Sequence, residues 1–298
     1  MTRLAITGAG GFIGREFVSS TRALGFEVVP LGRTELEASP DQHIAGCHAV
    51  VHLAARAHVL ESAAAADLDA FERSNVELTR AVAGAACRAG VARFVFVSSA
   101  GVLGRQSPPG GFDDNSRPAP HDAYTRSKLA AEEMLLDEFQ GSVEIVIVRP
   151  PLVYGPDAPG NFGRLVRLVR RGWPLPLGAL DAPRSMIGLR NLCDALRRVA
   201  TAPEANGLRL LVADRESPSV AGLVAEMAVA LGRRSRLWPV PPPVLRLAFG
   251  AVGRGQDFER LAAPFLLRPV LVPDRLGWHA PHRFADELRW AIASAGRP

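Results

Sequence analysis

Two side chains that can exchange a proton lie four positions apart in the segment AYTRSK (123–128). Tyr124 is one of two tyrosines in the chain, and Lys128 is its only lysine. On a helix, residues four positions apart project from the same face. The spacing therefore favours a functional pair, although one turn of an ordinary surface helix would show it as well.

A glycine-rich segment near the start of the chain has the spacing of a phosphate-binding loop. In LAITGAGGFIGREF, Gly8, Gly11 and Gly14 are three residues apart and lie between a strand-like run and a helix-like run. Glycine allows a tight turn and lets backbone N–H groups approach a pyrophosphate, whose charge the helix N-terminus stabilises. The register is GxxGxxG, because Ile13 occupies the last glycine position of GxGxxG. The segment predicts a dinucleotide site; a purely structural turn is the alternative.

The end of the second strand-like run bears on which dinucleotide is bound. An NAD site usually places an acidic residue there, about 20 residues after the glycines, where it binds the ribose. This chain has Gly32 and Arg33 instead. A guanidinium can pair with a 2′-phosphate, which a carboxylate would repel. The sequence thus favours NADP(H), while Glu35 or Glu37 leaves NAD(H) possible.

A third candidate group follows a buried, strand-like run. The segment RFVFVSSAGVLG (93–104) reads as a strand that ends at Ser98 and Ser99. In open parallel sheets, ligands bind beyond the carboxyl ends of the strands. We therefore expect Ser99 to face the ligand cleft.

The elements that must position these residues alternate along the first half of the chain. Helix-like segments such as 71–89 and 125–139 lie between strand-like runs at 4–7, 27–31, 49–53, 93–99 and 143–149. This alternation predicts an α/β fold: a Rossmann-type, doubly wound parallel sheet, with a smaller C-terminal substrate domain. After about residue 155 proline and glycine become frequent, and 208–213 is one more strand-like run. We expect a dinucleotide-binding domain over residues 1–155 and about 184–213, and a substrate-binding domain over residues 156–183 and 214–298.

Composition places the chain among soluble globular proteins. Of its 298 residues, 48% are hydrophobic and 22% are charged, and no stretch approaches the ~20 apolar residues that span a bilayer. The first residues lead directly into a strand-like run, so we expect no signal peptide and a cytoplasmic location. The three cysteines form no CxxC pair and read as reduced thiols. The net charge of +5 fits an acidic small molecule, and the lack of interleaved basic and aromatic residues argues against nucleic acid.

Two other kinds of site are disfavoured. His48 and His52 are four apart in a strand-like run, where that separation exceeds about 12 Å, and His279 and His282 are three apart. We therefore expect no metal site. No Gly-x-Ser-x-Gly elbow is present, which argues against a serine hydrolase.

Five motifs, in order along the chain, together resemble those of the extended short-chain dehydrogenases/reductases. They are the glycine loop, HLAA (52–55), SSAGVLG (98–104), YTRSK (124–128) and RPPLVYGP (149–156). The chain is similar in particular to the NAD-dependent epimerase/dehydratase family, which acts on nucleotide sugars. The similarity continues to RLGWHAP (275–281). It implies a Rossmann-fold enzyme, and relatives that dimerise through the helix carrying Tyr124 imply a homodimer.

The resemblance also implies roles for individual residues. Tyr124 would exchange a proton with a sugar oxygen, Lys128 would lower the pKa of Tyr124 and hold the nicotinamide ribose, and Ser99 would hydrogen-bond the reacting oxygen. The residues implied at the dinucleotide are Gly8, Gly11, Phe12, Ile13, Gly14, Arg33, Leu53, Ala54, Ala55, Tyr124, Lys128 and Pro151. The resemblance implies a UDP-linked sugar nucleotide, and the residues implied there are Ser99, Asn161 and Arg184.

The residues after Ser99 bear on the reaction. Family members that remove water from C5 and C6 carry an Asp-Glu pair where this chain has Ala100 and Gly101. Reduction and epimerisation remain, and Arg33 favours an NADPH-consuming reductase of a UDP-4-keto-6-deoxy-N-acetylhexosamine for surface polysaccharide synthesis. A UDP-hexose 4-epimerase that retains NAD is the alternative. A non-catalytic dinucleotide sensor on the same scaffold is a second alternative.

Overall fold

A six-stranded sheet forms the centre of the first half of the protein in the computed structural model, which describes residues 2–38, 40–56 and 68–294. All neighbouring strands pair in parallel, in the order β2-β1-β3-β4-β5-β8. The strands are β1 (Arg3–Thr7), β2 (Glu27–Leu31), β3 (Ala49–His52), β4 (Arg93–Val97), β5 (Glu144–Arg149) and β8 (Arg209–Leu211). Each lies within one residue of, or inside, a strand-like run of the sequence, so the predicted parallel sheet is confirmed.

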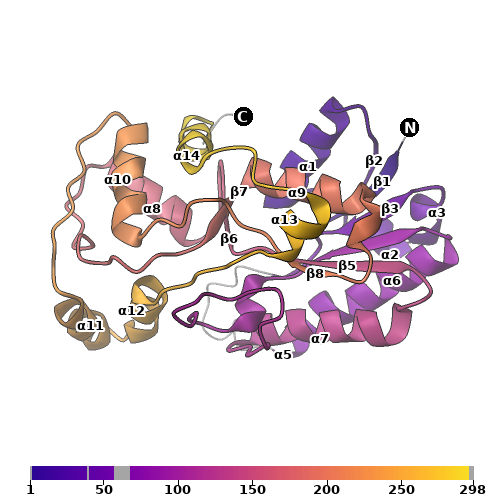
Figure 1. The fold of residues 1–298 in the computed structure, drawn as a ribbon, viewed down its shortest axis with the longest axis horizontal. Helices are drawn as coiled ribbons and strands as arrows, with labels where there is room; N and C mark the ends of the chain where they lie inside the picture. The colour runs from indigo at the N-terminus through magenta and orange to yellow at the C-terminus, as the bar shows by residue number, and fades with distance from the viewer. Residues whose placement is uncertain (1, 39, 57–67, 295–298) are drawn as a thin grey trace.

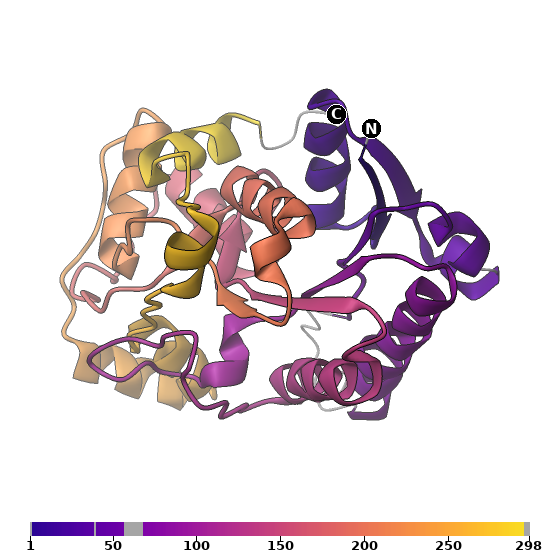
Figure 2. The ribbon, with the colours of Figure 1, turned by 45° about the vertical axis from the view of Figure 1, so that its right-hand side comes forward.

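Alternate residues of each strand pack on opposite faces of the sheet, as the two-residue period of a strand requires. On one face, residues such as Ile6 and Val148 meet α1 (Phe12–Ala23) and α9 (Leu189–Thr201). On the other face, residues such as Phe94 meet α6 (Leu78–Arg88) and α7 (Ala123–Phe139). Figures 1 and 2 show the sheet between these two helical layers. Helices on both faces confirm the doubly wound, Rossmann-type fold.

The connections of the first half are mostly helical. After β2 come α2 (Arg33–Ala38) and α3 (Pro40–Ile44). The helix that the sequence predicts over 71–89 is divided into α5 (Leu68–Phe71), a π-helical turn η1 (Glu72–Glu77) and α6. A 3₁₀-helix η2 (Ala100–Leu103) follows β4. Both irregular turns lie beside candidate site residues, as described below.

The second half builds a separate apolar core at one end of the molecule. Two three-residue strands, β6 (Leu152–Tyr154) and β7 (Met186–Gly188), pair in parallel outside the main sheet. Their residues pack with α8 (Asn161–Arg170), α10 (Val220–Ala230) and α14 (Phe284–Ala293), and a further pair, α11 (Pro242–Ala251) and α12 (Gly255–Ala262), lies at the lower left of Figure 1. The remaining turns are η3 (Pro203–Ala205) and α13 (Leu271–Leu276). The sequence did not reveal β6 and β7, because such short runs carry almost no periodicity.

The topology brings the candidate residues to one edge of the sheet. The chain leaves β1 toward β2 on one side and returns to β3 on the other, so β1 and β3 flank the switch point at which ligands bind in such sheets. The glycine loop follows β1, residues 53–56 follow β3, and Ser99 follows β4. All three segments lie at the carboxyl ends of parallel strands.

Candidate active site

The glycine loop is closed by contacts that exclude larger side chains at two positions. Gly8 has a left-handed backbone (φ 66°), and a Cβ there would lie 2.7 Å from the backbone nitrogen of Ala54. A Cβ at Gly14 would lie 2.2 Å from the Gly8 carbonyl oxygen. Gly10, in contrast, would meet nothing within 4 Å. The structure therefore explains the spacing 8, 11, 14 rather than 8, 10, 13.

The loop leaves a helix N-terminus open to an anion. Gly11 is exposed and precedes α1, and no side chain caps the first turn that Phe12 and Ile13 begin. The first backbone N–H groups of a helix lack internal partners and favour a phosphate. Together with the close packing at Gly8 and Gly14, this geometry fits a dinucleotide pyrophosphate.

The segment after β3 is fixed against this loop. The Leu53 amide donates to the Thr7 carbonyl at 3.3 Å, and the Ala54 amide donates to the Thr7 hydroxyl at 3.3 Å. Ala54 thus forms the wall that Gly8 packs against, while Ala55 is exposed beside it. The structure places the predicted Leu53, Ala54 and Ala55 next to the glycine loop.

The buried side chain of His52, the last residue of β3, holds the same strand end in place. Its side chain is fully buried, with Nδ1 2.8 Å from the Thr7 hydroxyl and Nε2 3.1 Å from the Thr79 hydroxyl. The ring stacks on Phe94 and Phe96, at centroid distances of 5.6 and 6.1 Å. Burial and the charge of the nearby lysine lower the pKa of His52 to about 3. His52 is therefore a neutral structural residue held between two threonine hydroxyl groups.

Ser99 begins the turn that follows β4. Its hydroxyl accepts a hydrogen bond from the Gly101 amide at 3.1 Å and caps the 3₁₀-helix η2. Ala100 is buried, and a Cβ at Gly101 would lie 2.9 Å from the Thr125 methyl group and 3.2 Å from the Ser99 hydroxyl oxygen. The position after Ser99 therefore has no room for an acidic side chain.

Helix α7 begins at a defined cap. The Asp122 carboxylate accepts from the Thr125 amide at 2.8 Å, and the Thr125 hydroxyl accepts from the Asp122 amide at 3.1 Å. This reciprocal capping box starts the helix at Ala123. The cap fixes where Tyr124 lies relative to Ser99 across the cleft.

Tyr124 and Ser99 are brought together from segments 25 residues apart in sequence. Burial, followed by the charge of Asp122, raises the pKa of the Tyr124 phenol to about 12, and the neighbouring Ser99 hydroxyl opposes that rise. The phenol ring also meets Phe71 edge-on, with centroids 6.3 Å apart. Tyr124 is therefore a buried phenol close to the Ser99 hydroxyl.

Lys128 lies one helical turn further, with its ammonium group in the interior. Its side chain is 1% exposed, and Nζ lies 4.0 Å from the centroid of the Phe96 ring. Burial lowers the pKa of Lys128 to about 7, and the Glu132 carboxylate opposes the change. Glu132 is itself fully buried and pairs with Arg149 at 2.5 Å. Sequence analysis missed this pair; its only signal was the four-residue spacing from Lys128 to Glu132.

A second buried polar group supports α7 from the π-helical turn. The Asn75 side chain accepts from the Arg56 amide at 2.7 Å, and its Nδ2 donates to the Ser127 hydroxyl at 2.9 Å. The Ser127 hydroxyl donates in turn to the Tyr124 carbonyl at 2.8 Å. π-Helical turns are rare and frequently occur at functional sites. Asn75 therefore holds the first turn of α7, a role that its place in the sequence did not suggest.

A carboxylate lies directly after β2, where the ribose of a dinucleotide is expected. Arg33 is the first residue of α2, and its side chain lies outside the described part of the structure. The Glu35 carboxylate accepts a hydrogen bond from the Gly32 amide at 2.8 Å, directly after β2. The Arg33 argument for NADP(H) thus stays a prediction, and the structure adds a carboxylate at the same strand end.

Comparison with known proteins connects this geometry to a family. Residues 4–212 match the NAD dependent epimerase/dehydratase family. The chain belongs to this family. It is 35% identical over 243 residues to the UDP-glucose 4-epimerase of Vibrio cholerae, which covers 80% of this chain and 74% of that protein. Since the relatives are NAD-dependent epimerases and reductases, the chain is an enzyme of the extended short-chain dehydrogenase/reductase class.

Solved structures of this kind share the fold over almost the whole chain. MoeE5 in complex with UDP-glucose and NAD has a TM-score of 0.78, with 24% identity over 98% of both chains. RMD from Pseudomonas aeruginosa complexed with NADPH has a TM-score of 0.78, with 19% identity over 98% of this chain and 99% of that one. The predicted resemblance is confirmed at the level of family and fold.

Three predicted residues lie in or beside the second half of the chain. Pro151 is buried between β5 and β6, and Asn161 is exposed at the start of α8. The Arg184 guanidinium donates to the Ala263 carbonyl and lies 6.0 Å from the Phe265 ring. Phe265 packs beside the buried residues of η2, which connects Arg184 to the Ser99 turn through one aromatic side chain.

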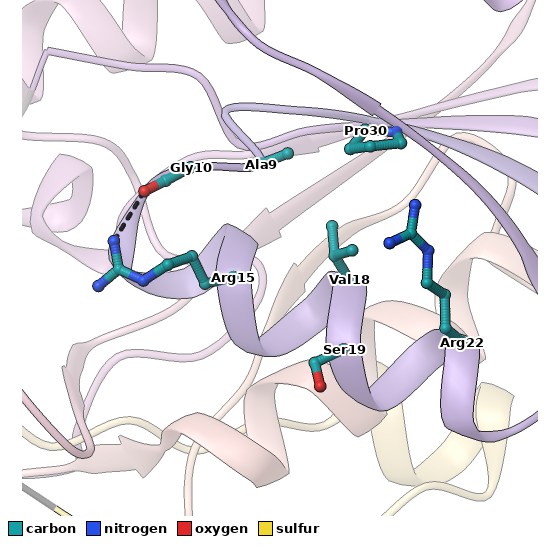
Figure 3. Close-up of a pocket in the computed structure, with 7 residues that line it drawn as sticks. All are labelled: Ala9, Gly10, Arg15, Val18, Ser19, Arg22 and Pro30. Atoms are coloured by element: carbon teal, nitrogen blue, oxygen red, sulfur yellow. Dashed lines mark hydrogen bonds between the residues drawn. The ribbon is translucent and has the colours of Figure 1, made fainter. Parts of the chain in front are cut away.

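A cavity of about 590 Å³ lies on the outer side of α1 (Figure 3). It is lined by Ala9, Gly10, Arg15, Val18, Ser19, Arg22 and Pro30. It shares Ala9 and Gly10 with the glycine loop, and the Arg15 guanidinium donates to the Gly10 carbonyl at 2.8 Å. None of the three candidate catalytic residues lines it, so the cavity belongs to the back of the loop.

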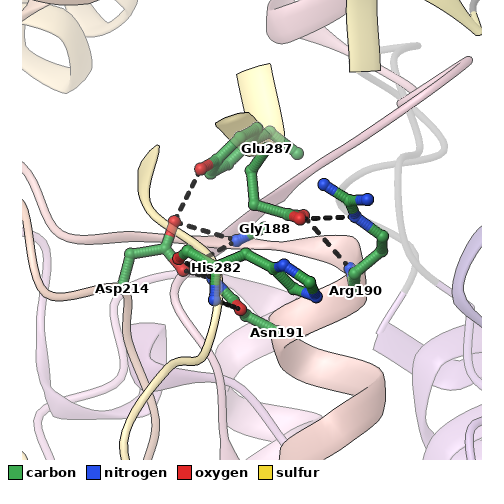
Figure 4. Close-up of polar contacts among 7 residues, drawn as sticks. Gly188, Arg190, Asn191, Asp214, His282 and Glu287 are labelled. Carbon is green, nitrogen blue, oxygen red and sulfur yellow. Dashed lines mark hydrogen bonds and ion pairs between the residues drawn. The ribbon is translucent and has the colours of Figure 1, made fainter. Parts of the chain in front are cut away.

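A buried polar cluster joins the two halves of the protein (Figure 4). The Asp214 carboxylate accepts from the Tyr154 hydroxyl at 2.6 Å and from the Asn191 amide at 2.7 Å. Burial raises the pKa of Asp214 to about 6, although these hydrogen bonds lower it. Glu287, also buried, pairs with Arg190 at 2.6 Å. The cluster ties β6, β7, α9 and α14 together and so fixes one core against the other.

The sequence led us to expect neither a metal site nor a membrane-spanning segment. No group of three or more His, Cys, Asp or Glu side chains there could hold a metal ion. No helix in the described ranges is long and apolar enough to cross a membrane.

Proposed function

We propose that the protein is an oxidoreductase that acts at C4 of a nucleotide sugar, with a nicotinamide dinucleotide as cofactor. The observation that carries this proposal is the placement of Tyr124 beside Ser99 at the carboxyl ends of the parallel strands, with Lys128 one helical turn further along α7. The same edge of the sheet holds the loop that fits a pyrophosphate. This arrangement suits proton transfer to an oxygen whose carbon exchanges a hydride.

Tyr124 holds the proton that the sugar oxygen gains or loses. A phenol with a pKa near 12 is a capable acid only if its anion is stabilised, and buried Lys128 supplies the positive charge on the same helix face. A bound nicotinamide would supply the hydride exchange, and its oxidised form would carry a second positive charge. Glu132 keeps Lys128 protonated more readily than burial alone would allow. Ser99 orients the sugar oxygen toward the phenol.

The turn after Ser99 argues against dehydration. Removal of water across C5 and C6 needs an acid and a base there, and the chain offers Ala100 and Gly101. The space at Gly101 is already taken by Thr125 and by the Ser99 hydroxyl. The reaction therefore moves a proton at one sugar oxygen and a hydride at its carbon, without loss of water.

The substrate proposal rests on the second half of the chain. Residues 156–183 and 214–298 would form the substrate domain, with Asn161 and Arg184 at the diphosphate. The Vibrio cholerae relative acts on UDP-glucose by its name, which supports a UDP-linked hexose. A homodimer, a cytoplasmic location and a place in surface polysaccharide synthesis belong to the same proposal.

Two reactions at C4 are compatible with these residues. The first candidate is reduction of a UDP-4-keto-6-deoxy-N-acetylhexosamine by NADPH, which Arg33 favours. The second is 4-epimerisation of a UDP-hexose with retained NAD, which the Vibrio cholerae relative and the Glu35 carboxylate at the end of β2 favour. Denaturing the purified protein and identifying the released nucleotide separates them: bound NAD supports the epimerase, and an empty site that takes up NADPH supports the reductase.

The test of the active site is Tyr124→Phe. We expect turnover to fall at least ~100-fold, the usual contribution of a general acid, with dinucleotide binding retained. Tyr154→Phe is the matched control, because it removes the only other phenol hydroxyl, which is buried against Asp214. Its rate per folded molecule should stay within a few-fold of the unmodified protein. Near-normal turnover of Tyr124→Phe would refute the assignment, and dinucleotide binding without turnover of any keto sugar or UDP-hexose would favour the sensor.

A further inference from the structure

The segment 237–253, LWPVPPPVLRLAFGAVG, contains one charged residue, yet most of it faces solvent. It comprises the end of the long connection after α10 and helix α11. Leu247 is 76% exposed and Val252 is 69% exposed, and Trp238 is 60% exposed. Single exposed apolar residues are common on soluble proteins, but a continuous run of them marks an interaction surface.

Helix α11 has two apolar faces, and only one is covered. Leu245 is buried in the core of the second half, with Phe249 packed beside it one turn later. Val244, Leu247, Ala248 and Ala251 recur at the spacing of a helical stripe and are all exposed. Arg246, the one charge on α11, is bonded to Glu259 of α12 at 2.9 Å. The outer stripe therefore has no polar side chain of its own.

Exposed arginines lie on the connection that leads from α10 to this stripe and on the segment paired with that connection, and they form its arginine border. The segment around Trp173 lies beside the segment 233–238, since the Leu175 amide donates to the Arg236 carbonyl at 2.8 Å and the Arg236 guanidinium donates to the Gly172 carbonyl at 3.2 Å. Trp173 is 59% exposed next to it. The exposed arginines of this border are Arg171, Arg233, Arg234 and Arg236. We call them and the stripe, with Trp173 and Trp238, the α11 surface.

The charge of this end of the molecule is strongly one-sided. Residues 161–181 and 228–262 contain ten arginines and three carboxylates, a formal charge of +7, whereas the whole chain carries +5. The rest of the chain is therefore slightly acidic. Within the described residues, no ion pair holds any of the four border arginines. Their charges are available to an anionic partner.

We propose that the α11 surface binds the face of an anionic lipid bilayer. Aliphatic side chains and prolines would enter the acyl boundary, tryptophans would lie at the headgroup level, and arginines would meet the lipid phosphates. A second copy of the chain fits less well as the partner. In a twofold symmetric contact the same surface of both copies meets, so the arginines of one copy would face the arginines of the other. Nucleic acid would call for stacking aromatics rather than a stripe of valine, leucine and alanine.

Helix α12 connects this surface to the start of the helix that carries Tyr124. Helix α12, to which α11 is tied, carries Arg260, whose charge acts on His121, three residues before Tyr124. The carbonyl of Ala263, directly after α12, accepts from Arg184. Figures 1 and 2 show α11 and α12 at the same end of the molecule, away from the body of α7. Binding through α11 would hold the substrate side of the cleft near the membrane face.

The experiment is co-sedimentation of the full chain with vesicles of phosphatidylcholine, with or without phosphatidylglycerol. We expect binding only to the anionic vesicles. Leu247→Glu should weaken it at least about tenfold, since it removes an apolar side chain that would enter the bilayer and adds a negative charge. Leu24→Glu is the matched control, because Leu24 is 62% exposed at the end of α1 and should leave binding unchanged. Replacing Arg233 and Arg234 by Gln should cost roughly fivefold for each arginine.

The results distinguish a lipid bilayer from a second copy of the chain as the partner of the α11 surface. No sedimentation with anionic vesicles, or equal binding by Leu247→Glu and the unmodified protein, would overturn the proposal. Light scattering on the same samples detects the other occupant: an oligomer that Leu247→Glu dissociates and Leu24→Glu does not would make the surface a contact between copies. None of these readouts depends on the sugar that the enzyme uses.

Discussion

Acidification from pH 7 to pH 5 is expected to destabilise the protein by about 2 kcal/mol through one residue, His52. The imidazole is fully buried between two threonine hydroxyls and stacked on Phe94 and Phe96. Burial and, secondarily, the charge of Lys128 lower its pKa from 6.5 to about 3. The unfolded chain therefore takes up this proton long before the folded protein does.

The sign and size follow from proton linkage. Below pH 6.5 the unfolded state binds one more proton than the folded state, so the free energy of unfolding falls by about 1.4 kcal/mol per pH unit until His52 titrates near pH 3. Between pH 7 and pH 5 the loss is about 2 kcal/mol. Lys128 affects stability in a different pH range. Because its pKa is lowered, the free energy of unfolding falls as the pH falls from 10.5 to about 7, and Lys128 adds little further pH dependence below neutrality.

The assay is urea unfolding at pH 7, 6 and 5, followed by circular dichroism, on the unmodified protein and on His52→Gln. Glutamine keeps a donor and an acceptor but has no proton to gain, so the variant should start less stable and lose less stability on acidification. Burial also lowers the pKa values of His121 and His282, which both proteins retain. The difference between the two pH slopes therefore isolates His52. Equal slopes would show that the buried imidazole is not the acid-sensitive group.

Three further changes probe the site. Glu132→Gln leaves a buried guanidinium unpaired and should cost about 3–5 kcal/mol in urea unfolding, whereas Glu138→Gln on the exposed side of the same helix should cost less than about 1 kcal/mol; comparable losses would contradict the buried-pair argument. Gly14→Ala pushes a Cβ into a backbone carbonyl and should abolish dinucleotide binding by calorimetry, while Gly10→Ala, with open space around it, should bind normally. Arg33→Ala should weaken NADPH far more than NADH in fluorescence titrations, and equal losses would remove the case for NADP(H).

Much of the fold could be predicted because the signals are local. Strands buried on both faces read as apolar runs, and the helices between them have lengths that close a crossover. The same holds for the residues around the cofactor loop, where Gly8 and Gly14 are required by contacts within their own turn and with the next strand. The π-helical turn at Asn75 was missed, because the sequence there has the composition of an ordinary helix.

The partners of buried polar groups could not be predicted, because they come from distant segments. Glu132 meets Arg149 from the following strand, and Asn75 meets Ser127 across 52 residues. His52 was assigned to the motif HLAA and disfavoured as a metal ligand, whereas the structure gives it two threonine partners and a stacking role. No spacing rule connects such positions until the sheet brings them together.

By itself, the sequence determined the parallel sheet and the family, and it predicted the set Ser99, Tyr124 and Lys128, because strand periodicity, turn glycines and motif spacing are encoded within short segments. Only the tertiary structure decided the pKa values of these side chains. Burial raises the pKa of Tyr124 and lowers that of Lys128, while Glu132 opposes the change at the lysine. Such shifts depend on what surrounds a group in three dimensions, which one-dimensional spacing does not specify. The exposed stripe of α11 was decided in the same way, since its composition alone would suit a buried helix.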